Sequence, residues 1–407
     1  ATDGLAAGAP AEDIFTWDTV TKRMPKILDS VLETLPPALA SERTLQEGVR
    51  QLQREMVDGA PLRLLEATGP WVDAEAWNEH LAAYIERGEG WHNAPWWIVE
   101  NYMYKRLLED LARCGGEGPR HDPFEPQKRQ ALGVAAGTFE SSVDPVLVAI
   151  ASAEAMPLGH EQRRAALETA ILRSLWGNQA DLSLSAGKVE SVGGGGQILS
   201  DHTALATDLL LGATGCPLVL VLDNHGLEVV CDLLLADALL RLTGAASVAL
   251  HVKEAPVFVS DVTATDVPGI LDWMSEHSSE LGARLKGFMA EGRLRVVSST
   301  FYNSARDFWE LPEDLRAEYA DAAVVILKGD ANYRRLLGDR HWPYDTDFDA
   351  YARSFWASPG LISLRTMKSG VALGIPAAQQ AEAKAARPKD WLTSGVYGQV
   401  LVSRRGA

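Results

Sequence analysis

The chain has 407 residues, of which 46% are hydrophobic and 23% are charged, and its formal net charge is −17 at pH 7. This is the composition of an ordinary globular protein, and the length predicts two lobes rather than one small domain. The negative charge disfavours nucleic acids and anionic membranes as partners. A small anionic substrate stays compatible with it, because a metal ion or a local basic cluster can reverse the field of one cleft.

The cysteines and the N-terminal segment bear on the compartment. Cys114, Cys216 and Cys231 follow no disulfide or zinc spacing, and we expect reduced thiols. The first fifteen residues lack the basic and apolar regions of a signal peptide, and no apolar run of about 18 residues predicts a membrane span. We therefore expect a cytoplasmic protein without a membrane partner and without an obligate protein partner.

The first half of the chain has the periodicity of helices, with apolar residues recurring at intervals of three and four. Turn-rich segments such as CGGEGPR (114–120) separate these stretches. We therefore predict a helical N-terminal lobe over residues 1–187. Its clearest helical stretches are 21–35, 44–56, 94–114 and 160–184.

From about residue 188, short β-branched runs alternate with helical stretches. This alternation is typical of an α/β fold with a mostly parallel, helix-covered sheet. We predict a three-layer α/β/α lobe over residues 188–407. The glycine-rich stretch SVGGGGQILS (191–200) lacks the spacing of a dinucleotide-binding turn. The predicted strands are 217–223, 246–252, 256–261, 294–299, 322–328 and 361–366.

Acidic and amide side chains stand at the carboxyl ends of the early predicted strands, where open α/β sheets bind ligands. Asp223 and Asn224 stand at the end of 217–223, and Asp261 ends 256–261. A separation of one crossover places Asp223 and Asp261 on adjacent strand ends. Hard divalent cations prefer carboxylate and amide oxygens, and Mg²⁺-like ions take only one or two carboxylates. These residues therefore predict a metal site.

Glu228 follows Asp223 on the first turn of a predicted helix. The helix dipole favours a carboxylate at this position, where it could support the metal ligands or act as a base. The alternative is an ordinary charge at a helix N-terminus.

The later predicted strands end in cationic residues. KGDANYRRL (328–336) places a glycine-bearing turn before a helix, and backbone N–H groups at a helix N-terminus bind anions. Arg334 and Lys368 add a guanidinium fork and an ammonium, both of which suit phosphate. The alternative for Arg334 is a solvated helix face. Acids and bases at the ends of one sheet indicate metal-assisted phosphoryl chemistry.

Several motifs resemble those of the damage-control phosphatase family, formerly a domain of unknown function. VLDNHGLEVV (221–230) resembles its DN-x-G-x-E signature, and KGDANYRRL and LRTMKS (364–369) resemble its KGD-x-N-Y-R and RT-x-K motifs. The RT-x-K form is similar to that of the subfamily of acidic-residue methyltransferase-like proteins and yeast sugar-phosphate phosphatases. TKRMPKIL, WHNAPWWIVENYMYKRL, LWGNQADLS and FVSDVTATD fit as well, so the resemblance covers nearly the whole chain.

This resemblance implies a phosphatase of small phosphometabolites, such as fructose or other hexose phosphates, with one divalent metal (Mn²⁺, Ni²⁺, Co²⁺ or Mg²⁺). It implies Asp223, Asn224 and Asp261 as metal ligands, and we assign catalytic roles to Asp223, Asp261 and Glu228. His225 stands where the family often has a small residue. The implied substrate contacts are Glu100, Asn101, Asn178, Asp181, Asp330, Asn332, Arg334 and Lys368.

Glu100 is unusual because the helix around it is otherwise apolar, and an acid there needs a partner or water. The alternative to a substrate contact is a buried ion pair with Arg106 or Arg87.

Two routes of phosphate hydrolysis stay open. A water activated by the metal attacks phosphorus in the first, and Asp223 attacks it directly in the second, which gives an aspartyl-phosphate.

Three rival functions stay open. The first is an S-adenosylmethionine-dependent carboxyl methyltransferase, but the turn at Asp223 is a poor cofactor cradle and Lys368 has no role in it. The second is a non-catalytic binding protein on the same scaffold. The third is a phosphatase of a specialised, non-sugar metabolite.

Overall fold

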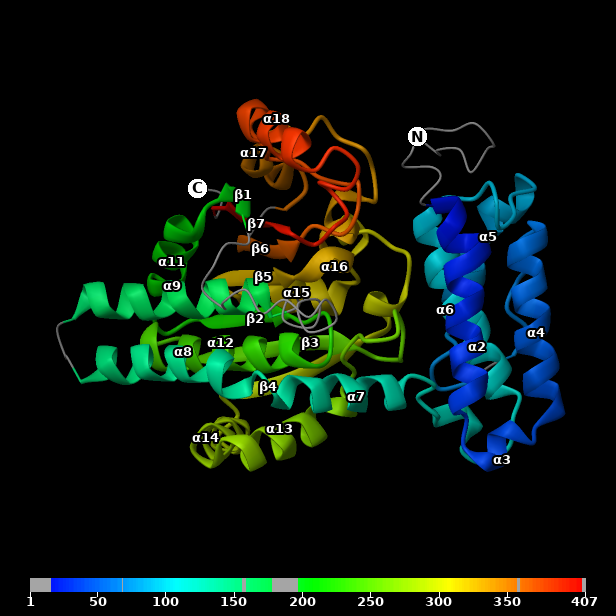
Figure 1. Cartoon of the computed structure of the whole chain (residues 1–407), viewed down its shortest axis with the longest axis horizontal. Helices are drawn as coiled ribbons and strands as arrows, with labels where there is room; N and C mark the ends of the chain where they lie inside the picture. The colour runs from blue at the N-terminus through cyan, green and yellow to red at the C-terminus, as the bar shows by residue number, and fades with distance from the viewer. Residues whose placement is uncertain (1–15, 68, 156–158, 178–196, 357–358, 405–407) are drawn as a thin grey trace. The chain divides into compact units, whose positions relative to one another are not determined.

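The computed structural model describes residues 16–67, 69–155, 159–177, 197–356 and 359–404. They form the predicted mixed α/β fold, and the sheet has seven strands (Figure 1). By its internal contacts the chain divides into two compact units. Unit 1 consists of Ala1–Gln127, Lys253–Ser260 and Ser299–Ala305, and unit 2 consists of Lys128–Val252, Asp261–Ser298 and Arg306–Ala407.

This division differs from the predicted boundary between residues 187 and 188. The helices α8 (Phe139–Glu154) and α9 (His160–Trp176) pack on α12 (Leu227–Leu242), so they belong to the unit that holds the sheet. In addition, two short segments from the second half of the chain belong to unit 1. Periodicity identifies helices but does not show on which neighbour a helix buries its apolar face.

Unit 1 is built mainly from helices, and the predicted helices at 21–35, 44–56 and 94–114 are confirmed. A π-helical turn at Thr19–Arg23 leads into α2. The longest helix of the unit, α6, is buried on nearly all sides although it carries charged residues. The α-helices of unit 1 are α2 (Met24–Thr34), α3 (Pro37–Ala40), α4 (Arg43–Asp58), α5 (Ala74–Glu86) and α6 (Trp96–Ala112).

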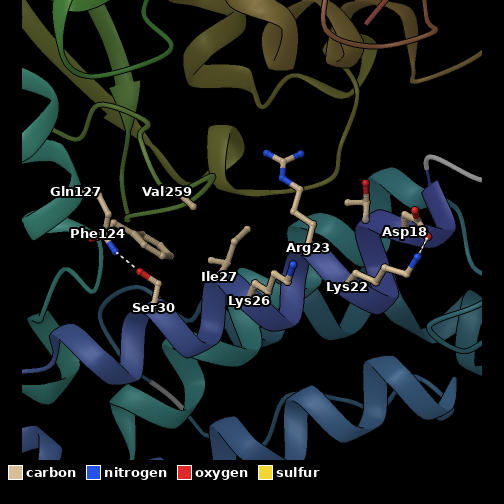
Figure 2. Close-up of a pocket in the computed structure, with 10 residues that line it drawn as sticks. Asp18, Lys22, Arg23, Lys26, Ile27, Ser30, Phe124, Gln127 and Val259 are labelled. Carbon is tan, nitrogen blue, oxygen red and sulfur yellow. Dashed lines mark hydrogen bonds and ion pairs between the residues drawn. The ribbon is translucent and has the colours of Figure 1, made fainter. Parts of the chain in front are cut away.

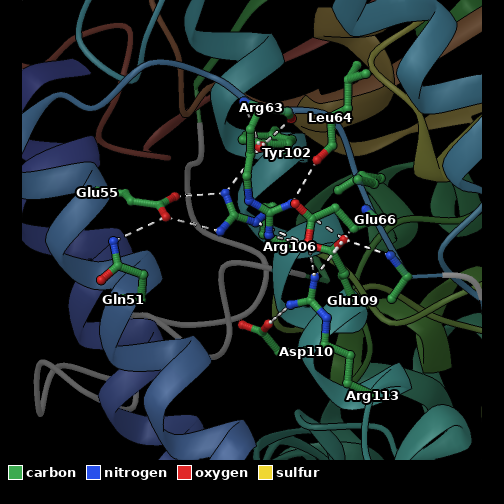
Figure 3. Close-up of polar contacts among 12 residues, drawn as sticks. Gln51, Glu55, Arg63, Leu64, Glu66, Tyr102, Arg106, Glu109, Asp110 and Arg113 are labelled. Carbon is green, nitrogen blue, oxygen red and sulfur yellow. Dashed lines mark hydrogen bonds and ion pairs between the residues drawn. The ribbon is translucent and has the colours of Figure 1, made fainter.

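Three charged residues of α6, Arg106, Glu109 and Asp110, are paired inside unit 1 (Figure 3). Arg106 donates to Glu55 over 2.7 Å. Arg87, which lies after α5, pairs with Glu89 at 2.6 Å. Both arginines considered as partners of Glu100 thus have carboxylate partners of their own, and the ion pair with Glu100 stays a prediction.

Asp110 of α6 makes the stability of unit 1 depend on pH. Burial raises the pKa of Asp110 to about 6, against the opposing charges of Arg106 and Arg113. Between about pH 4 and 6 the folded state keeps a proton that the unfolded carboxyl releases. The stability contributed by protonated Asp110 is therefore present below about pH 4 and lost as the pH rises through 6.

We expect Asp110→Asn, which cannot ionise, to gain free energy of unfolding relative to wild type as the pH rises from 4 to 6. The expected gain is on the order of 1–3 kcal/mol. Urea unfolding of both proteins at pH 4 and pH 6 measures it. A difference between the two proteins that is the same at both pH values would contradict this reading of Asp110.

Unit 2 is organised around the sheet, whose strand order is β1-β7-β6-β5-β2-β3-β4. β2 pairs in parallel with β3 and β5, β5 pairs in parallel with β6, and only the β6–β7 pair among those described is antiparallel. Five of the six predicted strands are confirmed, and β1 and β7 were not predicted. The strands are β1 (Gln197–Asp201), β2 (Pro217–Val221), β3 (Ser247–Lys253), β4 (Leu294–Ser299), β5 (Val324–Lys328), β6 (Gly360–Thr366) and β7 (Tyr397–Ser403).

The predicted strand at 256–261 is wrong, because this segment is a turn. Phe258 and Val259 have φ angles of 52° and 67°, which lie in the left-handed region rather than the β region. Asp261 then forms an isolated antiparallel bridge with Asn224. The β-branched and aromatic residues of this segment favour a strand, and the tertiary packing of Phe258 overrides that preference.

Helices and loops bury both faces of the sheet. Successive strand residues point to opposite faces. Leu218, Leu220 and Ile326 pack in one core with residues of α9 and α12, while Val219 and Leu327 on the other face are equally buried. This agrees with the predicted helix-covered sheet. The remaining helices are α7 (Glu125–Ala136), which begins in unit 1, and α11 (Thr203–Leu211), α13 (Asp266–His277), α14 (Ser279–Ala290), α15 (Glu313–Asp321), α16 (Gly329–Leu337), α17 (Phe348–Arg353) and α18 (Ala377–Ala386).

None of the described helices is by itself long and apolar enough to cross a membrane. Two consecutive helical segments within 118–154, which are bent relative to each other, meet the criteria of length and composition only when taken together.

The strand order reverses at β2, since β3 and β4 lie on one side of it and β5 and β6 lie on the other. In open α/β sheets, the crevice at the carboxyl ends of strands beside such a reversal is where ligands bind. The segments that follow β2 and β5 therefore meet at the edge where the sequence predicts the site.

Candidate metal and phosphate site

The backbone brings the three predicted metal ligands together. Asp223 and Asn224 follow β2, and Asp261 pairs with Asn224 through the isolated bridge. Next to it, the Val262 N–H donates to the Asp223 carbonyl over 2.9 Å. Asp223 and Asp261 are 4% and 1% exposed, so both residues are buried where their backbone segments meet. Asp261 reaches this position through a turn rather than from a strand end.

The Asn224 side chain is oriented by two carboxylates. Its Nδ2 donates to Asp223 Oδ2 and to Glu228 Oε2, each over 2.9 Å. With the amide nitrogen committed to carboxylates, the amide oxygen is the atom that would coordinate a cation. The position of Glu228 on the first turn of α12 thus serves to orient Asn224, and its predicted catalytic role stays a prediction.

Gly329, the first residue of α16, lies in close contact with the Asp223 side chain. Gly329 has a φ of 78°, and a Cβ atom built on it would lie 1.8 Å from Asp223 Oδ2. Only glycine lets the backbone adopt this conformation and come so close to a side chain. Asn332 fixes the contact, since its Nδ2 donates to the carbonyls of Leu222 over 3.1 Å and Lys328 over 2.8 Å.

We expect Gly329→Ala to displace the Asp223 carboxylate and to abolish measurable phosphate release, because the added methyl group and the carboxylate cannot share this space. Gly287→Ala is the matched control, since a Cβ there would meet no atom within 4 Å. Phosphate release and circular dichroism of both variants check the prediction. Full activity in a folded Gly329→Ala protein would contradict the placement of Asp223.

The donor set fits one hard divalent cation. Two buried carboxylates and an amide oxygen are ligands that such ions prefer, and buried carboxylates need compensating charge. Among the described residues, no three His, Cys, Asp or Glu side chains come together as a possible metal-binding group, so no third ligand of these types joins the two aspartates. An ion at Asp223, Asn224 and Asp261 would therefore keep several water ligands, as Mg²⁺-like ions do.

His225 adds no charge to this site at neutral pH. Burial lowers the pKa of its imidazole to about 4, and the nearby Asp266 and Lys128 contribute opposing smaller effects. Lys128 and Asp266 pair with each other at 2.8 Å.

Lys328, at the end of β5, points into the interior instead of into the anion site. Its Nζ lies 3.2 Å from Asp232 Oδ1 and 3.7 Å from Glu228 Oε1, and it donates to the Ser174 carbonyl over 2.7 Å. Burial lowers the pKa of Lys328, but the charges of Asp232 and Glu228 outweigh it, so the pKa is raised and the ammonium stays charged. Lys328 is thus the counter-charge that supports Glu228 and, through it, Asn224.

This supporting cluster was not predicted, although the sequence carries a signal for it. Glu228 and Asp232 are four residues apart and share one face of the mostly apolar helix α12. Acids are rarely buried unless they are paired, so this spacing predicts a buried cation.

The predicted phosphate contacts lie around the start of α16, and Asp330 and Arg334, like Asn332, make structural contacts as well. Asp330 Oδ1 accepts from the Lys368 N–H over 3.4 Å and lies 3.5 Å from the buried Arg365, so it holds the RT-x-K turn. Arg334 donates to Asp339 from Nε over 2.7 Å and from Nη2 over 3.2 Å. The predicted substrate roles of these residues stay predictions.

The other predicted substrate contacts come from the first half of the chain. Glu100 and Asn101 are buried in α6 of unit 1, where Asn101 Nδ2 donates to the Trp97 carbonyl over 2.8 Å. Asn178 and Asp181 lie outside the described residues.

The model of the ARMT1-like damage-control phosphatase domain matches residues 19–383. The chain belongs to this family. The damage-control phosphatase ARMT1 of Danio rerio is 31% identical over 97% of this chain and 96% of its own length. That of Rattus norvegicus is 31% identical over 95% and 96%, and that of Homo sapiens is 28% identical over 97% and 98%.

Among solved structures, a DUF89 family protein from Pyrococcus horikoshii is similar with a TM-score of 0.47 and 14% identity. The similarity covers 89% of this chain and 95% of that chain.

Membership confirms the predicted family. A damage-control phosphatase is a hydrolase of phosphate esters, and the family is divalent-metal dependent in general. The RT-x-K subfamily, the metal, the substrate and the role of each residue stay predictions.

Proposed function

We propose that this damage-control phosphatase hydrolyses a sugar phosphate, such as a fructose or another hexose phosphate, with one divalent cation at Asp223, Asn224 and Asp261. The cation would be Mn²⁺, Ni²⁺, Co²⁺ or Mg²⁺. The observation that supports this most is the approach of Gly329 to Asp223 Oδ2. It joins a carboxylate metal site to a helix N-terminus, which binds phosphate through its backbone N–H groups.

Some residues of the site bind the phosphate, and others orient the metal ligand Asn224. Lys368 and the N–H groups at the start of α16 hold phosphate oxygens, and these donors stabilise charge that develops there. Glu228 keeps the Asn224 amide in place, and the Lys328 ammonium lies 3.7 Å from Glu228 as its counter-charge. A bound divalent cation neutralises charge on the phosphate and lowers the pKa of a water molecule. Direct attack on phosphorus by Asp223 stays the alternative to attack by water.

We expect Lys368→Ala to lower kcat/KM by roughly 10- to 100-fold, because a hydrogen bond to a charged group contributes about 1.5–3 kcal/mol. Lys368→Arg should recover part of this loss, and Lys389→Ala, which alters an exposed lysine, should have no effect. Initial rates over a range of substrate concentrations measure all three. Unchanged kcat/KM in Lys368→Ala would remove Lys368 from the phosphate site.

Phosphate release from a panel of sugar, nucleoside and other small phosphate esters tests the proposed substrate class. The panel is run with each of the four metals and after removal of metal by a chelator. We expect the highest kcat/KM on a hexose phosphate and loss of release with the chelator. Release from non-sugar esters alone would overturn the substrate class, and release that survives chelation would overturn the metal.

A further inference from the structure

The helix α16 ends in a turn of unit 2 that joins Asp339 to Arg334 through the backbone. The Asp339 N–H donates to the Arg334 carbonyl over 2.8 Å, and the Gly338 N–H donates to the Arg335 carbonyl over 3.4 Å. These two bonds form a Schellman motif, which satisfies carbonyls that the last turn of a helix leaves unpaired. The backbone therefore places Asp339 beside Arg334 independently of the two side chains.

Two residues of this turn have left-handed backbone conformations. The φ angle is 65° at Gly338 and 49° at Asp339. Aspartate is one of the few residues other than glycine that adopt this region readily. A Cβ atom built on Gly338 would overlap the ring of Trp309, so the indole packs directly on the turn. The Arg340 guanidinium lies 5.2 Å from the centroid of the same indole. Backbone bonds and the packing of Trp309 thus hold the turn in place.

The side chains of Arg334 and Asp339 meet in a fork within this turn. Arg334 Nε donates to Asp339 Oδ1 over 2.7 Å, and Arg334 Nη2 donates to Asp339 Oδ2 over 3.2 Å. The two side chains are only 6% and 12% exposed. Two parallel bonds fix both the plane and the direction of a guanidinium. The orientation of the Arg334 guanidinium is therefore set by Asp339.

An exposed ion pair of unit 1 has none of this geometry. Asp18 and Lys22, which line a pocket of that unit, share one contact of 2.7 Å, and their side chains are 47% and 64% exposed (Figure 2). Exposed pairs with a single contact are weak and restrict little of the side-chain motion. The buried fork between Arg334 and Asp339 differs from such a pair in that it orients its cation.

Arg334 lies on the face of α16 that meets the RT-x-K turn. It follows Asp330 by four residues, and residues at this spacing share one face of a helix. Asp330 Oδ1 accepts from the Lys368 N–H over 3.4 Å. A cation on this face stabilises charge on a phosphate best when its position is fixed before the reaction.

From these contacts we infer that Asp339 is a positioning residue for the phosphate site: its carboxylate fixes the Arg334 guanidinium in the orientation that binds substrate phosphate. The inference rests on the proposed function and on the predicted role of Arg334 as a substrate contact. The charge of Asp339 opposes the attraction of a phosphate to this region. Asp339 can therefore support activity only by orientation.

The test is kcat/KM of the full-length protein on the best substrate of the phosphate-ester panel. Asp339→Gly removes the carboxylate and keeps the turn, because glycine adopts a φ of 49° without steric cost. We expect kcat/KM to fall about 10- to 100-fold, since a displacement of about 1 Å at a reacting group costs on the order of 100-fold. Asp339→Asn keeps an oxygen that accepts from Nε and should retain part of the activity.

A double-mutant cycle with Arg334→Ala separates positioning from a general structural role. Arg334→Ala/Asp339→Gly should be at least as active as Arg334→Ala, because no guanidinium is left to orient. Asp390→Gly is the matched control and should leave kcat/KM unchanged. Asp390 accepts from Arg387 Nε over 3.1 Å and from Nη2 over 2.6 Å, but its side chain is 43% exposed.

Circular dichroism checks the fold of every variant, and the cycle is repeated with Asp339→Asn, which keeps the volume of the side chain. Unchanged kcat/KM in both Asp339 variants, or a further loss in the double variant, would overturn the inference while Arg334→Ala is impaired. Full activity of Arg334→Ala would instead remove the predicted role of Arg334. No phosphate release by wild type would remove the proposed function. The inference falls with either of these.

Discussion

Replacing Asp261 by asparagine is expected to lower metal-dependent phosphate release by more than about 100-fold while the protein stays folded. Loss of a group that only orients a metal ligand costs 10- to 100-fold, and loss of a ligand charge should exceed this. Asp261 is 1% exposed and paired through its backbone with Asn224, so the amide variant keeps the shape and the bridge. Rates at increasing Mn²⁺ concentration measure the effect.

The same loss is expected for Asp223→Asn. Asp272→Asn is the matched control, because Asp272 is an acid of unit 2 whose side chain is 73% exposed. Activity of Asp261→Asn within tenfold of wild type at low Mn²⁺ would show that Asp261 is not a ligand.

Replacing Lys328 by methionine is expected to destabilise unit 2 by about 3–5 kcal/mol, the cost of breaking a buried ion pair by removing one partner. Lys328 is 1% exposed and lies between Asp232 and Glu228, so its loss leaves two buried carboxylates without their cation. Urea unfolding followed by circular dichroism at pH 7 measures the change.

Two further variants test whether the expected loss of stability comes from the unpaired buried charges. Lys328→Met/Asp232→Asn should regain a substantial part of the lost stability, because one of the uncompensated carboxylates is removed. Lys286→Met breaks an exposed pair with Asp272 and should cost only about 0–1 kcal/mol. Equal effects of Lys328→Met and Lys286→Met would show that the buried cluster does not stabilise the fold.

The sequence predicts most strands of the sheet because both faces are covered, which makes β2, β3 and β5 almost continuous apolar runs. β1 was missed because it is half-exposed and does not form a continuous apolar run. The segment at 256–261 has the composition of a strand, and only the three-dimensional contact of Phe258 with Trp97 reveals the turn.

The candidate site was predicted from residue type at strand ends, and the structure brings Asp223, Asn224 and Asp261 together as expected. Residue type could not show which polar groups face inward. Lys328 stands at a strand end next to the predicted phosphate contacts, yet it neutralises buried acids. A strand-end position identifies the edge of the sheet on which a residue lies, but not its side-chain partner.

Binding of one divalent cation by Asp223, Asn224 and Asp261 can be tested by anomalous diffraction from a crystal of the full chain soaked in Mn²⁺. We expect one strong peak whose distances to a carboxylate oxygen of each aspartate and to Asn224 Oδ1 are about 2.0–2.6 Å. A peak elsewhere, or none at these residues at a Mn²⁺ concentration that supports phosphate release, would contradict it.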